Sequence, residues 1–321
     1  MKTITIVIPV YNEEEALPQL VRRLDNMSKS LTNIKCDFLF INDGSEDQTL
    51  EIIKETRKTD PRVNYVDLSR NFGKELAMLA GFDYADGDAV VVIDGDLQQP
   101  PELILEMVKW WKKGYDDVYA VRVDREGESK FKDWTSRVYY KVIQKMTTEK
   151  VFPLAGDFRL LDKKCVQALR ELRESERYTK GMYGWIGFKK KKLTYVADER
   201  AAGQTKWDFS KLFKLALDGI TSYSTIPLRV WSYVGFVISF FSFVFLLIEI
   251  MKTLFWGTDA AGYPTLLAGI LFLGGIQLIS LGVMGEYLGR VFIETKNRPP
   301  YFIREKSGND SNIEKSKEDK A

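Results

Sequence analysis

Two long runs of uncharged residues in the C-terminal third constrain the fold of this chain more than any other feature. The run from Val230 to Ile248 holds 19 residues without a charged side chain, and the run from Ala260 to Gly285 holds 26. A helix of roughly 20 apolar residues can cross the hydrocarbon core of a bilayer. Long helices of soluble proteins usually keep a polar face, so a hairpin of buried core helices is the weaker alternative. We therefore predict two membrane-spanning helices, at residues 228–252 and 260–288.

Basic residues predict the orientation of these two spans. The loop between them, Glu249–Asp259, holds one lysine. The outer flanks carry Lys211, Lys214 and Arg229 before the first span and Arg290, Lys296, Arg298, Arg304 and Lys306 after the second. Lysine and arginine are enriched on the cytoplasmic side of membrane spans. We therefore predict a multi-pass protein of the plasma membrane whose two termini and N-terminal domain lie in the cytoplasm.

The composition limits the chemistry that the chain can perform. Histidine is absent, which argues against zinc sites, histidine-dependent triads and imidazole bases and leaves acid, base or metal chemistry to carboxylates. The two cysteines, Cys36 and Cys165, lie far apart and outside any CxxC pattern, as expected of reduced thiols. The net charge is +2 and no basic stretch is interleaved with aromatic residues, so we expect no nucleic-acid partner.

Short apolar runs alternate with helical patterns through the first half of the chain. This order indicates a mostly parallel sheet built from βα units, which we assign to an α/β domain at residues 1–206. We predict strands at Thr3–Val10, Asp37–Asn42, Val63–Leu68, Ala89–Asp94 and Asp117–Val123. We predict helices near Glu14–Ser28, Asp47–Thr59, Gly73–Ala85 and Pro101–Lys113.

The predicted strands end in polar residues. Ligands of open α/β sheets bind outside the carboxyl ends of the strands, so we expect four neighbouring strand ends to form one crevice. Its residues would be Asn12, Glu13, Asp43, Asp94, Asp96, Gln98 and Arg122. The chain has no GxGxxG and no GxxxxGK[ST], so a bound diphosphate would need a cation held by aspartates instead of glycine-rich amides. Asp94 and Asp96 would repel each other without such a cation, although an ordinary Asp-Gly turn is the plainer alternative.

Two amphipathic stretches lie between the sheet and the spans. Trp134, Val138, Val142 and Met146 share one helical face, and so do Leu212, Leu215, Ala216 and Ile220. Such faces could lie in the membrane interface or pack on the sheet. We predict an interfacial helix at 207–227, directly before the first span, and a basic tail at 289–321 that is disordered from Ser307 onward.

An ordered set of motifs carries a family resemblance. The chain contains VIPVYNEEE, NDGSEDQT, SRNFGKELAMLAGF and DGDLQ in that order, followed by AGDFRLLD, GWIGF, the RxxGxTKW run at Arg200–Trp207, MGEYLGR and RPPY. The first four resemble the GT-A domain of family 2 glycosyltransferases. The full set, from Thr3 to Tyr301, resembles the membrane-bound polyprenyl-phosphate glycosyltransferases, the bactoprenol glucosyltransferase group related to dolichol-phosphate mannose synthases.

The resemblance implies a fold and a reaction. The fold is a Rossmann-like GT-A domain with a mostly parallel sheet, followed by interfacial helices and two transmembrane helices. The reaction is an inverting transfer of glucose or N-acetylglucosamine from a UDP-sugar to undecaprenyl phosphate, giving a lipid-phosphate-linked sugar for the cell envelope. The family also implies a homo-oligomer, with the tetramer as the candidate size.

The resemblance also assigns residues to the donor and to a metal ion. The donor set is Pro9, Tyr11, Asn12, Glu13, Asp43, Asp94, Asp96 and Gln98. Of these, Asp94, Asp96 and Gln98 would hold Mg²⁺ or Mn²⁺ on the diphosphate, since hard cations take oxygen ligands. Asp96 is thereby one of two residues implied to be catalytic.

The second is Asp157, which matches the position of the family's candidate catalytic base. A phosphate monoester has its second pKa near ~6, so a lipid-phosphate acceptor needs little deprotonation at neutral pH. Asp157 could instead orient the acceptor or balance nearby arginines. An N-cap for a segment starting at Phe158 is a further alternative.

Cations that grip phosphate are expected on the acceptor side, because planar guanidinium groups bind phosphate oxygens bidentately. The candidates are Arg122, Arg125, Ser136, Arg137, Arg200 and Lys206. Thr205 stands where the family usually has serine, which preserves the hydroxyl.

Two rival functions remain at this stage. A polysaccharide synthase on the same domain would carry QxxRW and enough spans for a channel, and the sequence shows neither. A non-catalytic membrane scaffold with this fold would have no physical need for clustered carboxylates.

Overall fold

The structure is a computed structural model of the chain. It describes residues 1–123, 155–175, 177–196 and 262–307, together with short helical pieces between 233 and 255. The chain divides into two compact units, one drawn from Met1–Lys206 and Pro299–Ala321 and the other from Trp207–Arg298.

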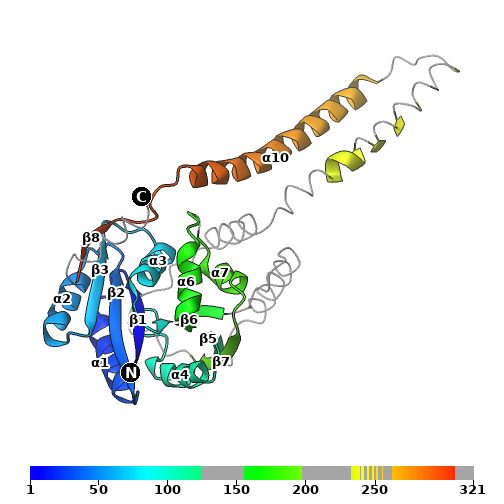
Figure 1. The fold of residues 1–321 in the computed structure, drawn as a ribbon. Helices are drawn as coiled ribbons and strands as arrows, with labels where there is room; N and C mark the ends of the chain where they lie inside the picture. Colours follow the sequence, from blue (N-terminus) through cyan, green and yellow to red (C-terminus); the bar gives the residue numbers. More distant parts are fainter. Residues whose placement is uncertain are drawn as a thin grey trace, which may run out of the picture. The chain divides into compact units, whose positions relative to one another are not determined.

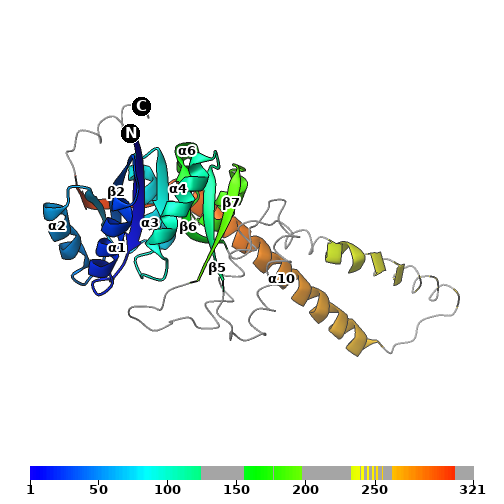
Figure 2. The ribbon, with the colours of Figure 1, turned by 90° about the horizontal axis from the view of Figure 1, so that it is seen from below.

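In the described residues of the first unit, eight strands form one sheet in the order β7-β5-β6-β4-β1-β2-β3-β8 (Figure 1). The order runs from β7 at one edge to β8 at the other (Figure 2). Strands β1, β2, β3 and β4 pair in parallel, as do β5 and β7, whereas β6 and β8 are antiparallel to their neighbours. The strands are β1 Lys2–Val10, β2 Ile34–Asn42, β3 Val63–Leu68, β4 Ala89–Val92, β5 Asp117–Val123, β6 Ala155–Asp162, β7 Lys190–Val196 and β8 Ile303–Lys306.

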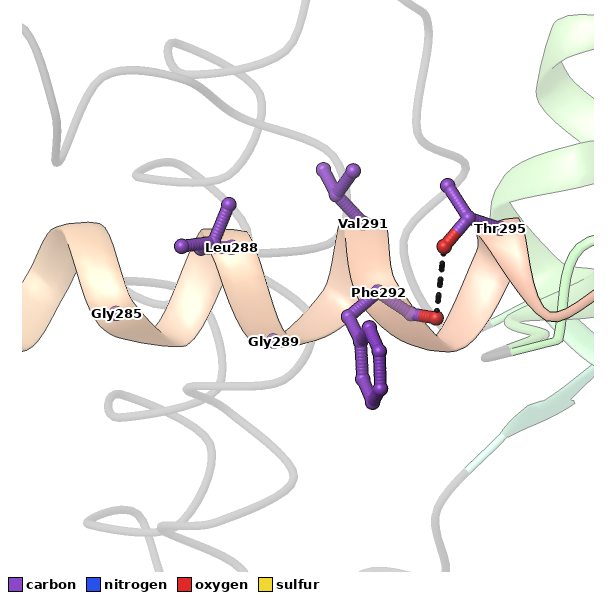
Figure 3. A pocket seen from close by; sticks show the side chains of 6 residues that line it. All are labelled: Gly285, Leu288, Gly289, Val291, Phe292 and Thr295. Carbon is purple, nitrogen blue, oxygen red and sulfur yellow. Dashed lines mark hydrogen bonds between the residues drawn. The ribbon is translucent and has the colours of Figure 1, made fainter.

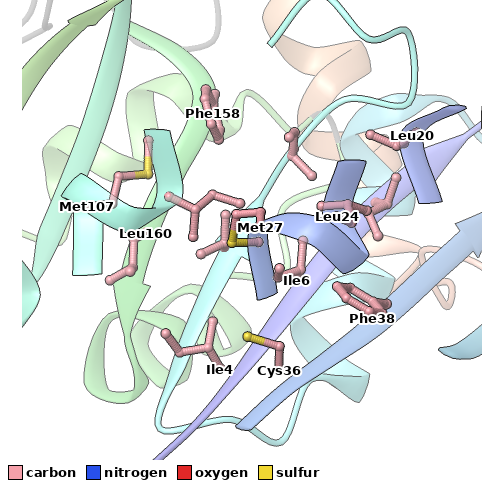
Figure 4. Packing of buried hydrophobic residues seen from close by; sticks show 14 of the residues in the cluster. Ile4, Ile6, Leu20, Leu24, Met27, Cys36, Phe38, Met107, Phe158 and Leu160 are labelled. Carbon is pink, nitrogen blue, oxygen red and sulfur yellow. The ribbon is translucent and has the colours of Figure 1, made fainter. Parts of the chain in front are cut away.

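Helices cover both faces of this sheet. They are α1 Leu17–Lys29, α2 Thr49–Thr59, α3 Lys74–Tyr84, α4 Ile104–Lys112, α6 Lys163–Glu171 and α7 Thr179–Trp185, with a 3₁₀ turn η1 at Pro101–Leu103. The side chains of one core lie between the sheet and α1, α2 and α4, and those of the other between the sheet and α3, α6 and α7. Alternation along β1 supplies both cores, because Ile4, Ile6 and Ile8 point to one face and Val7 to the other. Figure 4 shows the first core, where Ile4 and Ile6 lie among side chains of α1, β2, α4 and β6.

The βα alternation predicted for the first half of the chain is confirmed. All five predicted strands and four predicted helices are present, and each boundary lies within three residues of its prediction. The buried apolar runs set the strands, and the turns around Pro101 and Asp47 set two helix starts. Asp47 accepts a hydrogen bond from the Thr49 backbone at 3.0 Å.

Strand β6 corrects two expectations. It lies between β4 and β5, so the ends of β4 and β5 are not neighbours as we expected, and Arg122 is separated from Asp94 by a strand. Asp157 lies inside β6, so the alternative role as an N-cap at Phe158 is wrong. The cap of the following helix is Asp162, whose side chain accepts a hydrogen bond from the Lys164 backbone. The sequence AGDFRLLD lacks strict alternation, which is why the strand was not predicted.

Strand β8 corrects the predicted tail at 289–321. Residues 303–306 pair with β3, with Val66 opposite Lys306 and Leu68 opposite Ile303. The chain after the apolar helix is therefore part of the α/β unit up to Ser307. Its four residues, of which Arg304 is exposed and the other three are half-buried, form an edge strand too short to be seen in the sequence without its partner.

The second unit contains the long helix α10, Tyr263–Thr295. Among the described residues, its segment Phe272–Thr295 is the one helix long and apolar enough to cross a membrane. The second predicted span, 260–288, lies mostly in α10, which continues seven residues beyond it. Most of the first predicted span and all of the 207–227 stretch lie outside the described residues.

A pocket runs along α10 and is lined by Gly285, Leu288, Gly289, Val291, Phe292 and Thr295 (Figure 3). Its one side-chain polar group is the Thr295 hydroxyl, which donates to the Phe292 carbonyl at 3.0 Å. The residues that line this pocket supply no acidic or basic group for catalysis.

Candidate active site

Two aspartates, Asp94 and Asp157, meet where β4 ends and β6 begins. The register pairs Val92 with Arg159, so two further residues along each strand bring Asp94 opposite Asp157. Both carboxylates contact one ammonium group: Lys74 Nζ lies 2.6 Å from Asp94 Oδ1 and 3.1 Å from Asp157 Oδ2. The antiparallel strand thus delivers Asp157 to the carboxyl edge of a parallel sheet.

Lys74 was not predicted as a site residue, although it stands in the motif SRNFGKELAMLAGF. It is the first residue of α3, and Gly73 precedes it with φ +94°, a conformation that favours glycine. Burial opposes the charge of Lys74, but the carboxylates of Asp94 and Asp157 outweigh burial and raise its pKa. The lysine therefore stays protonated and balances one of the two negative charges.

The pKa values of the two aspartates move in opposite directions. Burial raises the pKa of Asp94, Lys74 opposes this shift, and the charge of Asp157 adds to it, so the net pKa is raised. Burial also raises the pKa of Asp157, which is 6% exposed, but Lys74 and then Lys180 outweigh it and the net pKa is lowered. Asp157 is thus held as a carboxylate. Its Oδ1 is buried without a hydrogen-bond partner in the described part of the chain.

In the turn after β4, Asp94 is held by Gln99, the residue that follows the DGDLQ segment. Gln99 accepts from the Asp94 backbone at 2.9 Å and donates Nε2 to Asp94 Oδ2 at 2.8 Å. The structure therefore brings Gln99 to Asp94, whereas Gln98 contributes its backbone N–H to Asp96 Oδ1 at 3.1 Å. Leu97 has φ +61°, which is uncommon for a residue with a side chain and marks a tight turn.

The ends of β1 and β2 carry the residues predicted for the nucleotide. Asn12 has φ +54°, its backbone donates to Ser45 Oγ at 3.0 Å, and its side chain accepts from the Glu46 backbone at 2.9 Å. The Glu13 backbone donates to Thr49 Oγ1 at 2.9 Å. Tyr11 is 41% exposed, whereas Pro9 is buried within β1. Apart from Pro9, these residues share the edge of the sheet to which the strand ends point.

Asp43 connects β2 to the start of α3. Its two oxygens accept from the Phe72 backbone at 2.7 Å and the Gly73 backbone at 2.9 Å. Burial raises the pKa of Asp43, and these two hydrogen bonds oppose the shift. Gly44 follows with φ +68°, and a Cβ there would lie 2.5 Å from the Arg70 backbone, so only glycine fits.

A buried ion cluster anchors β6 behind Asp157. Asp117 is fully buried and contacts Arg159 at 3.0 Å and Lys190 at 2.8 Å. Arg159 also donates to the Gly156 carbonyl at 2.9 Å and lies 3.4 Å from the centre of the Tyr183 ring. These contacts fix the backbone on either side of Asp157. The sequence does not predict a role for Arg159, because arginine side chains are mostly exposed and nothing in the motif indicates that this one is buried.

Of the predicted acceptor residues, the structure describes only Arg122. Arg122 lies near the end of β5, where it is exposed and pairs in register with Tyr195 of β7. Arg125, Ser136, Arg137, Arg200 and Lys206 lie outside the described residues.

Comparison with known proteins identifies the family. Residues 5–170, about half of the chain, match the family model described as glycosyl transferase family 2. This chain belongs to glycosyltransferase family 2. It is an enzyme of that family with a GT-A-like α/β fold. The whole carboxylate–lysine cluster lies within the matched region, since Lys74, Asp94 and Asp157 all fall inside residues 5–170.

Similar members of the family are found in bacteria and phages. The chain is 48% identical over 300 residues to an uncharacterised glycosyltransferase of Synechocystis, covering 94% of each chain. It is 44% identical over 301 residues to the bactoprenol glucosyl transferase of Shigella phage SfII, covering 94% of this chain and 97% of the relative. Glucosyl-3-phosphoglycerate synthase from Mycobacterium tuberculosis, solved with UDP, aligns at 16% identity and a TM-score of 0.46 over 69% of this chain and 79% of that one.

Proposed function

We propose that this family 2 glycosyltransferase transfers glucose from UDP-glucose to a polyprenyl phosphate of the undecaprenyl type. The observation that carries the proposal is the cluster of Asp94, Lys74 and Asp157 at the carboxyl edge of the sheet. Its support is the 44% identity, over nearly the whole chain, to proteins named bactoprenol glucosyl transferase. These names favour glucose over N-acetylglucosamine as the sugar.

The nucleotide of the donor would bind at the ends of β1 and β2. Tyr11 offers an exposed ring for stacking, and Asn12, Glu13 and Asp43 offer polar groups on loops that their own hydrogen bonds hold in place. Stacking and a few convergent polar groups are the usual means of recognising a base and ribose. Pro9 would act through the β1 backbone, because its ring is buried.

The oxygen ligands that Asp94 and Asp96 offer fit a divalent cation. Both residues supply oxygen ligands, which suit Mg²⁺ or Mn²⁺, and Lys74 shows that Asp94 lies where a positive charge is stabilising. In the described residues, no three acidic or sulfur side chains gather to hold a metal by themselves, so the diphosphate, and Gln98 as predicted, would complete the ligands. Such a cation would neutralise charge developing on the departing diphosphate.

The chain's own residues would then orient a single displacement. An oxygen of the acceptor phosphate forms the bond to the anomeric carbon, and the bond from that carbon to the diphosphate oxygen breaks, with its electron pair leaving on UDP. The acceptor is already mostly dianionic at neutral pH, so no proton needs to be removed. Asp157, held ionised by Lys74, would orient the reacting groups through Oδ1, which has no hydrogen-bond partner among the residues that the structure describes. Positioning of this kind can contribute much of a rate enhancement.

The acceptor phosphate and the membrane complete the proposal. Arg122, with Arg125, Ser136, Arg137, Arg200 and Lys206, would bind the lipid phosphate. Helix α10 and the 228–252 stretch would anchor the enzyme in the plasma membrane as two spans, with an interfacial helix at 207–227 and the catalytic domain in the cytoplasm. We also keep the homo-oligomer, with the tetramer as its candidate size, as a prediction from the family.

A transfer assay tests this function. Purified enzyme in detergent would be given undecaprenyl phosphate, Mg²⁺ or Mn²⁺, and either UDP-[¹⁴C]glucose or UDP-N-acetyl[¹⁴C]glucosamine, and label entering the lipid phase would be counted. We expect label from UDP-glucose that EDTA abolishes. Binding of UDP-glucose without lipid labelling from either donor would favour another acceptor or the non-catalytic scaffold, and growth of a polymer would favour the polysaccharide synthase.

A further inference from the structure

A chain of hydrogen bonds connects the strand after α10 with the loops assigned to the nucleotide. Its first member is Arg304 of β8, whose guanidinium lies 3.3 Å from Asp67 Oδ2 and donates to the Ser69 carbonyl at 2.8 Å. Asp67 of β3 is fully buried. Among the described residues Arg304 is the one cation in ion-pair contact with it, and a buried carboxylate without a cation is strongly unfavourable.

Asp67 also connects β3 to β2. The register places Asn42 opposite Asp67, and Asn42 Nδ2 donates to Asp67 Oδ1 at 2.7 Å. Asn42 is itself fully buried. An ionised carboxylate only accepts hydrogen bonds, so it decides which end of the Asn42 amide points toward β3. The amide oxygen must then face the other way, toward the loop that follows β2.

The side-chain oxygen of Asn42 accepts hydrogen bonds from Ser45, and Ser45 in turn accepts one from Asn12. Ser45 donates its hydroxyl to Asn42 Oδ1 at 2.5 Å and its backbone N–H to the same oxygen at 3.3 Å. Because the hydroxyl proton is used in this way, Ser45 Oγ accepts from the Asn12 backbone at 3.0 Å. The backbone N–H groups of Ser45 and Asn12 always donate, so what depends on an acceptor at Asp67 is the orientation of the Asn42 amide and, through it, of the Ser45 hydroxyl.

The local backbone needs this support. Asn12 has φ +54°, a conformation that a residue with a side chain rarely adopts, whereas Gly44 in the facing loop has φ +68°, which glycine adopts readily. The hydrogen bonds from Ser45 to Asn42 and from Asn12 to Ser45 lie between these two positions. If the Asn42 amide changed its orientation, the hydrogen bonds that hold these two loops would be lost together.

We propose that Arg304 is a positioning residue for the nucleotide subsite, acting through Asp67, Asn42 and Ser45 on Asn12. The inference rests on the proposed function, because it assumes that these loops hold a nucleoside diphosphate. It makes the segment after the apolar helix a functional part of donor binding, although Arg304 itself touches no substrate.

The same strand supplies a matched control. Glu305, the next residue, lies opposite Asp67 in the register of β8 and β3, and its side chain forms an ion pair with Lys54. Strand β8 is also anchored by Tyr301, whose hydroxyl donates to Asp83 at 2.6 Å, and by Ser307, whose hydroxyl accepts from the Tyr65 backbone at 2.7 Å. Glu305→Gln therefore removes an ion pair of β8 but leaves the hydrogen-bond chain intact.

Hydrogen exchange and UDP binding on the full-length enzyme in detergent test the proposal together. In Arg304→Met we expect faster amide exchange in peptides that contain Asn12 and Ser45, and a Kd for UDP, with Mn²⁺ present, that is raised roughly tenfold, as for a lost hydrogen bond to a charged group. Glu305→Gln should match the wild type in both measurements. Adding Asp67→Asn to Arg304→Met should restore both, because an asparagine oxygen can still accept from Asn42 without a buried charge.

Three outcomes would overturn the proposal. Wild-type exchange and UDP binding in Arg304→Met would show that the chain of bonds does not depend on Arg304. Equal effects of Glu305→Gln and Arg304→Met would show that docking of β8 alone matters. If the wild type binds no UDP while exchange changes as expected, the nucleotide donor of the proposed function is wrong, and with it the role of Arg304 in donor binding.

Discussion

Strand β4 ends and strand β6 begins among charged side chains, whereas the loops after β1 and β2 are held by hydrogen bonds of backbone and neutral side-chain groups, with one buried carboxylate, Asp43. At the first place Lys74 lies between Asp94 and Asp157, and the negative charge exceeds the positive charge. At the second place Asn12 and Ser45 are held by hydrogen bonds of fixed direction. The first arrangement can respond to charge that arrives with a substrate or develops in a reaction. The second keeps its loops in one conformation, which suits binding of a ligand. We therefore assign chemistry to the first region and donor recognition to the second.

The largest expected effect comes from removing a carboxylate of the charged region. Asp94→Asn keeps the size of the side chain and its contact with Gln99 but removes the charge that faces Lys74. We expect kcat for transfer to fall by about a hundredfold or more, as for loss of a group that stabilises developing charge. Asp88→Asn is the control, because Asp88 lies at the opposite end of β4 and accepts from the Thr3 backbone. Full activity of Asp94→Asn would place the chemistry elsewhere.

Lys74→Met tests whether the charged region depends on its internal cation. Without Lys74, burial dominates and the pKa of Asp157 rises, so Asp157 takes up a proton at a higher pH. We expect a fall in kcat of about tenfold at neutral pH. As the pH is lowered, the variant should lose activity before the wild type does, because in the wild type the pKa of Asp157 lies below its ordinary value.

The pH profile of kcat, measured for both proteins, checks this prediction. Titration of the acceptor phosphate is common to the two profiles and cancels in their ratio. Lys164→Met is the matched control, since Lys164 also stands in the first turn of a helix and pairs with an aspartate, Asp116, at 2.8 Å. Parallel profiles for Lys74→Met and the wild type would contradict the role of Lys74.

Asp43→Asn tests the recognition region at its one buried carboxylate. The two oxygens of Asp43 accept from Phe72 and Gly73, and asparagine can replace only one of these acceptors. We expect KM for the nucleotide sugar to rise by about tenfold while kcat changes less. Steady-state kinetics with varied donor separates the two parameters. If kcat instead fell by about tenfold while KM stayed unchanged, Asp43 would act in the chemical step and not in recognition of the donor.

The smallest effect is expected from Ser45→Ala. It removes one neutral hydrogen bond to Asn12 and one to Asn42, each contributing about 1 kcal/mol in typical proteins. KM for the donor should rise a few-fold, less than in Asp43→Asn, with little change in kcat. Ser28→Ala in α1, whose hydroxyl donates to the Asp25 carbonyl, is the control. A larger effect on kcat than on KM would erase the distinction between the two regions.

Much of the fold could be predicted from the sequence because the strands that matter are short apolar runs between turn signals. Residues 4–10 are buried on both faces and residues 63–68 are mostly buried, so both segments are clearly recognised as strands. The antiparallel strands β6 and β8 could not be read in this way. Polar and charged residues interrupt both, and the pairing that makes them strands involves residues far away in the chain.

The candidate site shows the same division. The DGDLQ segment and Asp43 could be recognised because carboxylates at strand ends are unusual and have few structural reasons. Lys74, Gln99 and Arg159 could not, because lysine, glutamine and arginine are common in helices, turns and surface positions. Their importance comes from what they contact.

The sequence by itself determined the βα order, the apolar C-terminal helix, the family and the chemical type of the site, since these depend on residue types and on local spacing. Only the tertiary structure decided that Asp157 faces Asp94 across two antiparallel strands, that Lys74 lies between them, and that Arg304 reaches a carboxylate more than 200 residues away. The physical reason is that a buried charge is stable only beside its partner. Which partner that is depends on strand order and register, and neither is written in the local sequence.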